Sequence, residues 1–128
     1  MEILIDFPGG ARVDAHVRGH LVHTDQPRSG GGDDSAPSPF ELFLASLGTC
    51  AGIYILGFCR QRNLPTEGVR IVQRVHADTI ELEIQVPPAF PKQYLGALIR
   101  SAELCKGGLH KYFHAMIPFN PKPDHLVF

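Results

Sequence analysis

Apolar and polar residues alternate over the first 24 residues of the chain, as they do in strands with one buried face. The clearest stretch is 12–18, where three apolar residues alternate with four charged or polar ones. A partial alternation at 2–7 precedes it and a short strand-like segment at 21–24 follows, with glycine-containing turn signals between them. The pattern predicts an antiparallel meander of three strands.

A long apolar run begins after Ser38, where the pattern changes from strand to helix. Ser38 suits the N-cap, Pro39 suits the first helical position, and Glu41 is spaced to complete a capping box with Ser38. No charged residue occurs from 42 to 59, and apolar residues cover every face of the helix. Because a helix that is apolar all round must be buried, we expect a long central helix, buried on all sides and ending near Arg62.

The same run is long enough to cross a membrane. Gly48 and Gly52 form a GxxxG pair, which in a membrane would be a helix-packing face. The flanking strands, however, are amphipathic and need an apolar partner, and this helix is the largest apolar surface available to them. We therefore expect a buried core helix and no membrane span.

The rest of the chain adds more strands and a second helix. Segments 69–76 and 79–86 alternate, and 92–105 carries apolar residues at helical spacing. A helical turn at 109–113 and a strand at 115–119 are expected after it.

The order of strands, helix, strands, helix, strand predicts an α+β fold. We expect antiparallel sheets around the central helix, in a single domain over 1–128. One buried helix facing a small sheet leaves apolar surface uncovered, which favours an intertwined homodimer. The segment 25–37, rich in Gly, Asp, Ser and Pro, is expected to be the loop that leads to the helix.

The charge balance excludes several classes of partner. Twelve basic and thirteen acidic residues leave the chain near neutrality, which argues against binding to nucleic acid or to an anionic membrane surface. The first ten residues lack the basic patch of an export signal, so we expect a cytoplasmic protein.

A metal site is not expected from the seven histidines. Cys105, His110 and His114 have spacings that could ligate zinc, and three further histidines lie close together at 16–23. No clear set of four ligands emerges from either group.

The chain has three cysteines and no CxxC pair. In a reducing compartment such residues are buried thiols or redox groups and not structural disulfides. Cys50 lies near the middle of the apolar helix, where free cysteine commonly packs as a small hydrophobe. Cys59 lies nine residues later and faces the other way, so we expect it in the core. Cys105 ends the second helix.

The segment APSPFELFLASLGTC at 36–50, followed by a strand pair and a second helix ending in Cys105, resembles the OsmC/Ohr family. The likeness is to its OsmC-like branch, with a Pro-Ser-Pro-x-Glu helix start, a Leu-Gly-x-Cys midpoint and a glycine-rich loop before Ser38. It extends from about Gly30 to Leu109. The resemblance implies an α+β fold of two swapped subunits with the central helices at the dimer core.

The resemblance also implies an activity. Characterised members of this family are thiol-dependent peroxidases that reduce organic hydroperoxides, so by position Cys50 would be the peroxidatic cysteine and Cys105 the resolving one. Arg12 would hold the thiolate in an active geometry, with Arg18 and Arg28 as further candidates. Glu41 would assist it, although its spacing from Ser38 fits a helix cap at least as well. No bound cofactor is implied, and a dithiol reductant would recycle the disulfide.

The chemistry needs a cation that the helix itself does not supply. Cys50 lies roughly three turns into an apolar helix, where the helix dipole is weak and burial raises the pKa of a thiol. An arginine can provide a charge that does not titrate. The alternative function is a non-catalytic OsmC-like dimer that binds a hydrophobic small molecule.

Overall fold

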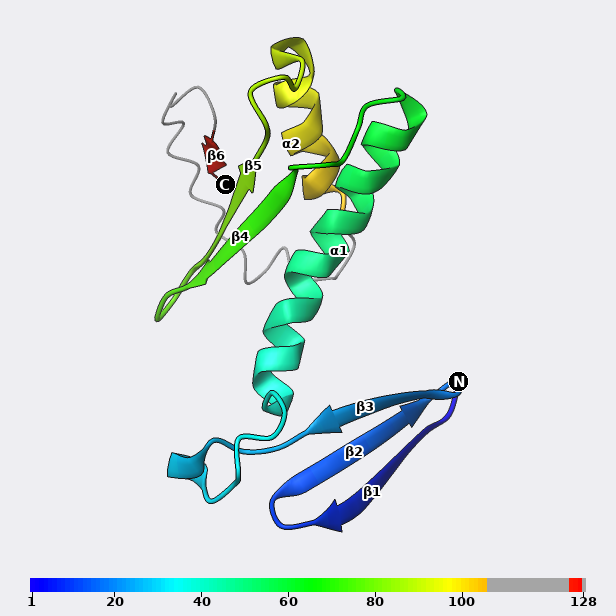
Figure 1. The fold of residues 1–128 in the computed structure, drawn as a ribbon, viewed down its shortest axis with the longest axis vertical. Helices are drawn as coiled ribbons and strands as arrows, with labels where there is room; N and C mark the ends of the chain where they lie inside the picture. Colours follow the sequence, from blue (N-terminus) through cyan, green and yellow to red (C-terminus); the bar gives the residue numbers. More distant parts are fainter. Residues whose placement is uncertain (106–124, 128) are drawn as a thin grey trace. The chain divides into compact units, whose positions relative to one another are not determined.

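The structure, a computed structural model, describes residues 1–105 and 125–127 (Figure 1). The chain divides into two compact units, Met1–Ser46 and Leu47–Phe128. The architecture is α+β with two antiparallel three-stranded sheets and a long helix, which confirms the predicted fold class. The prediction of a single domain over 1–128 stays a prediction.

The first unit contains the predicted meander. Its strands are β1 (Ile3–Gly9), β2 (Arg12–Val17) and β3 (His20–Thr24), paired antiparallel in the order β1-β2-β3. Arg18 and Gly19 form the turn between β2 and β3, and both have positive φ values, of 50° and 81°. The tight turn fixes the register, in which Asp14 of β2 lies opposite Asp6 of β1 and His23 of β3.

The loop after β3 is organised by Asp25, which is only 1% exposed. The Asp25 carboxylate accepts hydrogen bonds from the Gln26 backbone N–H at 2.8 Å, from the Ser35 backbone N–H at 3.0 Å and from the Ser35 hydroxyl at 2.6 Å. Gly32 lies against this arrangement so closely that a Cβ atom there would be 2.0 Å from the Gln26 carbonyl oxygen. The loop, which includes a 3-10 turn at Arg28–Gly30, is therefore held by specific contacts.

The long helix α1 (Pro39–Gln61) begins and ends where the sequence signals indicate. The Glu41 carboxylate accepts from the Ser38 N–H at 2.8 Å, and the Ser38 hydroxyl accepts from the Glu41 N–H at 3.3 Å. This reciprocal pair is the predicted capping box. At the other end, Asn63 lies two residues after Gln61 and has a left-handed φ of 52°, which is incompatible with continuation of the helix.

The second unit contains the second sheet and the second helix. Its strands are β4 (Arg70–Val75), β5 (Ile80–Gln85) and β6 (His125–Val127), paired antiparallel in the order β4-β5-β6. A 3-10 turn at Lys92–Tyr94 leads into α2 (Leu95–Glu103). The predicted helical turn at 109–113 and strand at 115–119 lie outside the described residues.

One core joins α1, the second sheet and α2. Its members come from these three elements and from the segment after β5, and they are Ala51, Ile55, Phe58, Cys59, Ile84, Val86, Phe90, Leu98 and Ala102. Gly48 has its explanation here, because a Cβ at this position would be 2.5 Å from the Gln73 Oε1 atom. A Cβ at Gly52 would make an ordinary contact of 3.8 Å with the Ile71 Cδ1 atom. The absence of a Cβ at Gly48 thus lets the Gln73 side chain of β4 approach α1.

The expectation that α1 is buried on all sides is wrong for the single chain. Only five of its 23 residues are buried: Leu47, Ala51, Ile55, Phe58 and Cys59. Phe40 and Ile53 are about two-thirds exposed, at 65% and 66%. A small sheet and one short helix cover one side of α1 and leave its other apolar residues uncovered. By length and composition α1 could also span a membrane, as its sequence suggested.

Candidate redox site

Cys50 and Cys105 are joined by a disulfide bond, with their Cα atoms 5.9 Å apart. Cys50 lies near the middle of α1, and Cys105 lies just beyond the end of α2, where its N–H donates to the Ala102 carbonyl at 3.2 Å. The two residues are 55 positions apart in the sequence. The fold therefore brings together two thiols that only the family resemblance had paired.

The core holds the two helices that carry these cysteines. Ala51, next to Cys50, is 3% exposed, and Ala102, three residues before Cys105, is 5% exposed. Both belong to the same apolar cluster as Leu98, which is fully buried. Because neighbours of both cysteines are packed in one core, the sulfur atoms are kept within bonding reach by tertiary packing.

The third cysteine, Cys59, is a core residue as predicted. It is fully buried and carries a free thiol. Burial raises the pKa of the Cys59 thiol, and the nearby positive charge of Arg62 opposes this only in part. A buried thiol with a raised pKa is unreactive, so Cys59 is unsuited to redox chemistry.

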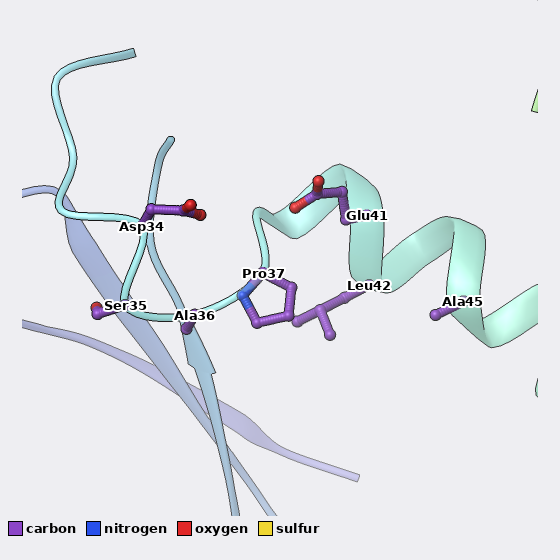
Figure 2. A pocket seen from close by; sticks show the side chains of 7 residues that line it. All are labelled: Asp34, Ser35, Ala36, Pro37, Glu41, Leu42 and Ala45. Carbon is purple, nitrogen blue, oxygen red and sulfur yellow. The ribbon is translucent and has the colours of Figure 1, made fainter. Parts of the chain in front are cut away.

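Glu41 is engaged in capping α1, the role that its spacing from Ser38 indicated. It also borders an open hollow of about 560 Å³ (Figure 2). The hollow is lined by Asp34, Ser35, Ala36, Pro37, Glu41, Leu42 and Ala45. In Figure 2 the carboxyl groups of Asp34 and Glu41 point toward each other, while Pro37 and Leu42 supply an apolar wall.

Arg12, the arginine that the resemblance singled out, lies at the start of β2 and is paired with an acid. Its Nη2 atom is 3.5 Å from the Oδ2 atom of Asp14, whose side chain is only 7% exposed. The same Oδ2 atom lies 3.0 Å from Nδ1 of His23. The other two candidates are placed differently, since Arg18 is a turn residue and Arg28 begins the 3-10 turn in the loop.

Sequence reasoning overlooked Asp14 and His23. Strict alternation in β2 put Asp14 on the polar face beside Arg12, where a solvated carboxylate is the ordinary expectation. The missing information was the register of β2 against β3, which places His23 opposite Asp14. A two-residue hairpin turn at Arg18-Gly19, if recognised in the sequence, would have predicted that register.

The four predicted site residues fall into the two units. Arg12 and Glu41 belong to the first unit, and Cys50 and Cys105 belong to the second. The structure joins Cys50 to Cys105, pairs Arg12 with Asp14 and pairs Glu41 with Ser38. The catalytic roles of all four stay predictions.

A metal ion has no evident set of ligands in residues 1–105, where no three His, Cys, Asp or Glu side chains are placed to hold one. His110 and His114, which the sequence offered as companions to Cys105, lie outside the described residues.

Comparison with known proteins places this arrangement in a family. A family model described as OsmC-like protein matches residues 31–107, which is more than half of the chain. The chain belongs to the OsmC-like protein family. The family resemblance that the sequence suggested is thus confirmed.

A solved structure has the same fold. The crystal structure of a protein from Psychrobacter arcticus 273-4, titled as an osmotic stress induced and detoxification response protein, aligns with a TM-score of 0.67 and 19% sequence identity. The alignment covers 81% of this chain and 82% of that one. No curated protein matches this chain. At this identity the structural likeness establishes the OsmC-like fold alone.

Proposed function

We propose that this OsmC-like protein is a thiol-dependent peroxidase that reduces organic hydroperoxides to alcohols as part of oxidative stress defence. The observation that carries the proposal is the bond between Cys50 and Cys105. A peroxidase of this kind needs a second thiol within bonding reach of the first. In the proposed cycle Cys50 is the peroxidatic cysteine and Cys105 resolves it.

The proposed reaction proceeds in two steps at sulfur. The Cys50 thiolate attacks the terminal peroxide oxygen, the O–O bond breaks, and one proton converts the alkoxide leaving group into an alcohol. Cys50 is thereby oxidised to a sulfenic acid. The Cys105 sulfur then attacks the Cys50 sulfur, and the S–O bond breaks with loss of water, which leaves the disulfide.

A reductant must reopen the disulfide for a second turnover. Its attacking thiolate forms a mixed disulfide with one cysteine of the pair, and its second thiol displaces that cysteine by thiol–disulfide exchange. The two electrons that reduce the peroxide therefore come from an external dithiol. We expect the protein to meet this reductant in the cytoplasm.

The proposed cycle assigns Arg12 as the cation that favours the Cys50 thiolate. Cys50 lies about three turns from the start of α1, where the helix dipole contributes little. An arginine suits the role because its charge does not titrate and its guanidinium has several N–H donors in a fixed plane. Glu41 is the weaker assignment, because its carboxylate caps α1.

Thiol counting tests the proposed function. Reduced protein, freed of reductant, is treated with one equivalent of cumene hydroperoxide, and intact mass and free thiols are measured before and after. The proposal expects the loss of two hydrogens and two thiols in the wild type and formation of one cumyl alcohol per chain. In Cys50→Ser the free-thiol count should stay unchanged and no peroxide should be consumed. Cys59→Ser, the matched control at the buried thiol, should behave as the wild type. Unchanged thiols in the wild type would overturn the peroxidase.

The alternative, a non-catalytic dimer that binds a hydrophobic small molecule, is favoured by one observation. The hollow at the start of α1 has an apolar wall that includes Pro37 and Leu42 (Figure 2). A binding protein of this kind would keep its affinity for an apolar ligand in Cys50→Ser and would not consume peroxide. The same variant therefore separates the two functions.

A further inference from the structure

Asp14 is a buried carboxylate in the middle of a largely exposed sheet. The residue is 5% exposed, whereas all seven residues of the neighbouring strand β1 are exposed. Removing a carboxylate from water is costly unless the group is paired and hydrogen-bonded. The contacts of Asp14 therefore carry information about its role.

Two side chains meet Asp14 at the same oxygen. His23 contacts Oδ2 through Nδ1 at 3.0 Å, and Arg12 contacts it through Nη2 at 3.5 Å. Because a carboxylate only accepts hydrogen bonds, Nδ1 of His23 carries the proton and donates it, which fixes the orientation of the carboxyl group. The longer contact to Arg12 involves one of its guanidinium nitrogens.

The other oxygen of Asp14, Oδ1, is buried and has no hydrogen-bond partner within the described part of the chain. A guanidinium binds a carboxylate most strongly through two parallel N–H···O bonds, one to each oxygen. Oδ1 is thus the acceptor that a two-point contact with Arg12 requires. Because His23 holds the carboxylate in one orientation, Asp14 is a fixed binding site for the guanidinium of Arg12.

A second Asp–His pair on the same sheet provides a comparison. Asp6 lies opposite Asp14 in the register and contacts His16 at 3.0 Å. The Asp6 side chain is 51% exposed, and no arginine contact is recorded for it among the described residues. The two pairs share their chemistry and differ in burial and in the arginine, so the special feature of Asp14 is its contact with Arg12.

We propose that Asp14, held by His23, is a positioning residue for Arg12 in the reaction of Cys50. The inference rests on the proposed function, which assigns Arg12 as the cation that favours the thiolate. Asp14 takes no part in bond making or proton transfer. It restricts the guanidinium of Arg12, and the N–H donors that the carboxylate does not use can bind a second anion.

A double-mutant cycle tests this role. The rate constant for oxidation of Cys50 by cumene hydroperoxide is measured in reduced wild type, Arg12→Ala, Asp14→Asn and the double variant. Loss of a charge-assisted contact is expected to lower the rate about tenfold or more in Asp14→Asn. Because Asp14 acts through Arg12, the double variant should be no slower than Arg12→Ala alone.

Asp6→Asn is the matched control. It removes the same charge from the same face of the sheet, at the pair that lacks an arginine, and its rate should equal that of the wild type. A pair of His23 variants gives a second measurement. Asparagine places its amide nitrogen near the position of Nδ1, so His23→Asn should retain the rate that His23→Ala loses.

The results separate three outcomes. The positioning role is overturned if Asp14→Asn reacts as fast as the wild type. It is also overturned if the rate of the double variant is lowered by the product of the two single effects, because Asp14 would then act independently of Arg12. A failure of Asp14→Asn to fold leaves the His23 pair to decide in the same way. If the wild type does not react with hydroperoxide, the proposed function fails. The double-mutant cycle is then measured with another reaction, the rate of alkylation of Cys50 by iodoacetamide, which mass spectrometry of the peptide that contains Cys50 reports. Absence of coupling in that cycle overturns the positioning role as well.

Discussion

At the scale of single residues, three carboxylates of the first unit have different partners and therefore different roles. Asp14 is paired with the cation Arg12, Asp25 accepts hydrogen bonds from neutral N–H and O–H groups, and Glu41 caps a helix. A carboxylate that accepts several hydrogen bonds is stabilised in its charged form. The charge of Asp25 therefore contributes to folding, whereas that of Asp14 is available to orient another side chain.

The Asp25 contacts predict a pH dependence of stability. Hydrogen bonds from the Ser35 hydroxyl, and from backbone N–H groups, lower the pKa of Asp25 from 3.8 to about 2. Since the folded state then binds the proton less readily than the unfolded state, the contribution of Asp25 is complete above pH 4 and is lost as the pH falls to about 2. Urea unfolding between pH 2 and pH 7 measures it.

Two variants make this measurement specific. Asp25→Asn should be less stable than the wild type at neutral pH, and the difference should shrink as the pH falls from 4 to 2. Asp78→Asn, at an exposed bend, should follow the wild type over the whole range. A constant difference between Asp25→Asn and the wild type across this range would contradict the assignment.

At the scale of elements, local signals in the sequence were enough for most boundaries. Alternation gave the strands, and the Ser38–Glu41 capping box gave the start of α1, because these signals depend on residues close together in the chain. Pairing of Cys50 with Cys105 came from the family resemblance, since no local pattern relates residues 55 positions apart. The contact of Asp14 with His23 needed the strand register.

Burial of α1 was the least predictable feature. An apolar residue signals burial only when another part of the molecule can cover it, and the sequence does not state how much surface is available. The sheet side of α1 is closely packed at Gly48, where a Cβ would be 2.5 Å from Gln73 Oε1. At Gly57, on the same helix, no side chain or other element among the described residues comes within 4 Å of the corresponding position.

These two glycines predict different responses to alanine. Gly57→Ala should stabilise the isolated chain by up to about 1 kcal/mol, because alanine is the better helix former and no neighbouring element of the same chain, within its described part, opposes the Cβ. Gly48→Ala should gain less or lose stability, since the Gln73 amide must move. Thermal unfolding compares them, and Gln73→Ala should reduce the penalty of Gly48→Ala. Equal effects of the two alanines would contradict the close packing at Gly48.

At the scale of the whole molecule, the uncovered apolar residues of α1 call for a partner surface. Phe40 and Phe43 stack on each other with their ring centroids 6.1 Å apart, and Ile53 is 66% exposed. Leaving large apolar side chains in water forgoes about 1.5–3 kcal/mol for each one that could be buried. We propose that a second copy of the chain covers them, as the resemblance implied.

The homodimer predicts a change of mass on a single substitution. Light scattering on the wild type as it elutes from a size-exclusion column should give a molar mass twice the chain mass of 14.1 kDa. Ile53→Glu puts a charge where the partner would cover α1, and it should weaken the dimer by about a hundredfold or more, since a buried unpaired charge is costly. Gln61→Glu, which puts the same charge at an exposed position of the same helix, should remain dimeric. A monomeric wild type would contradict the dimer, and recovery of the wild type only in the membrane pellet would instead favour a membrane-spanning α1.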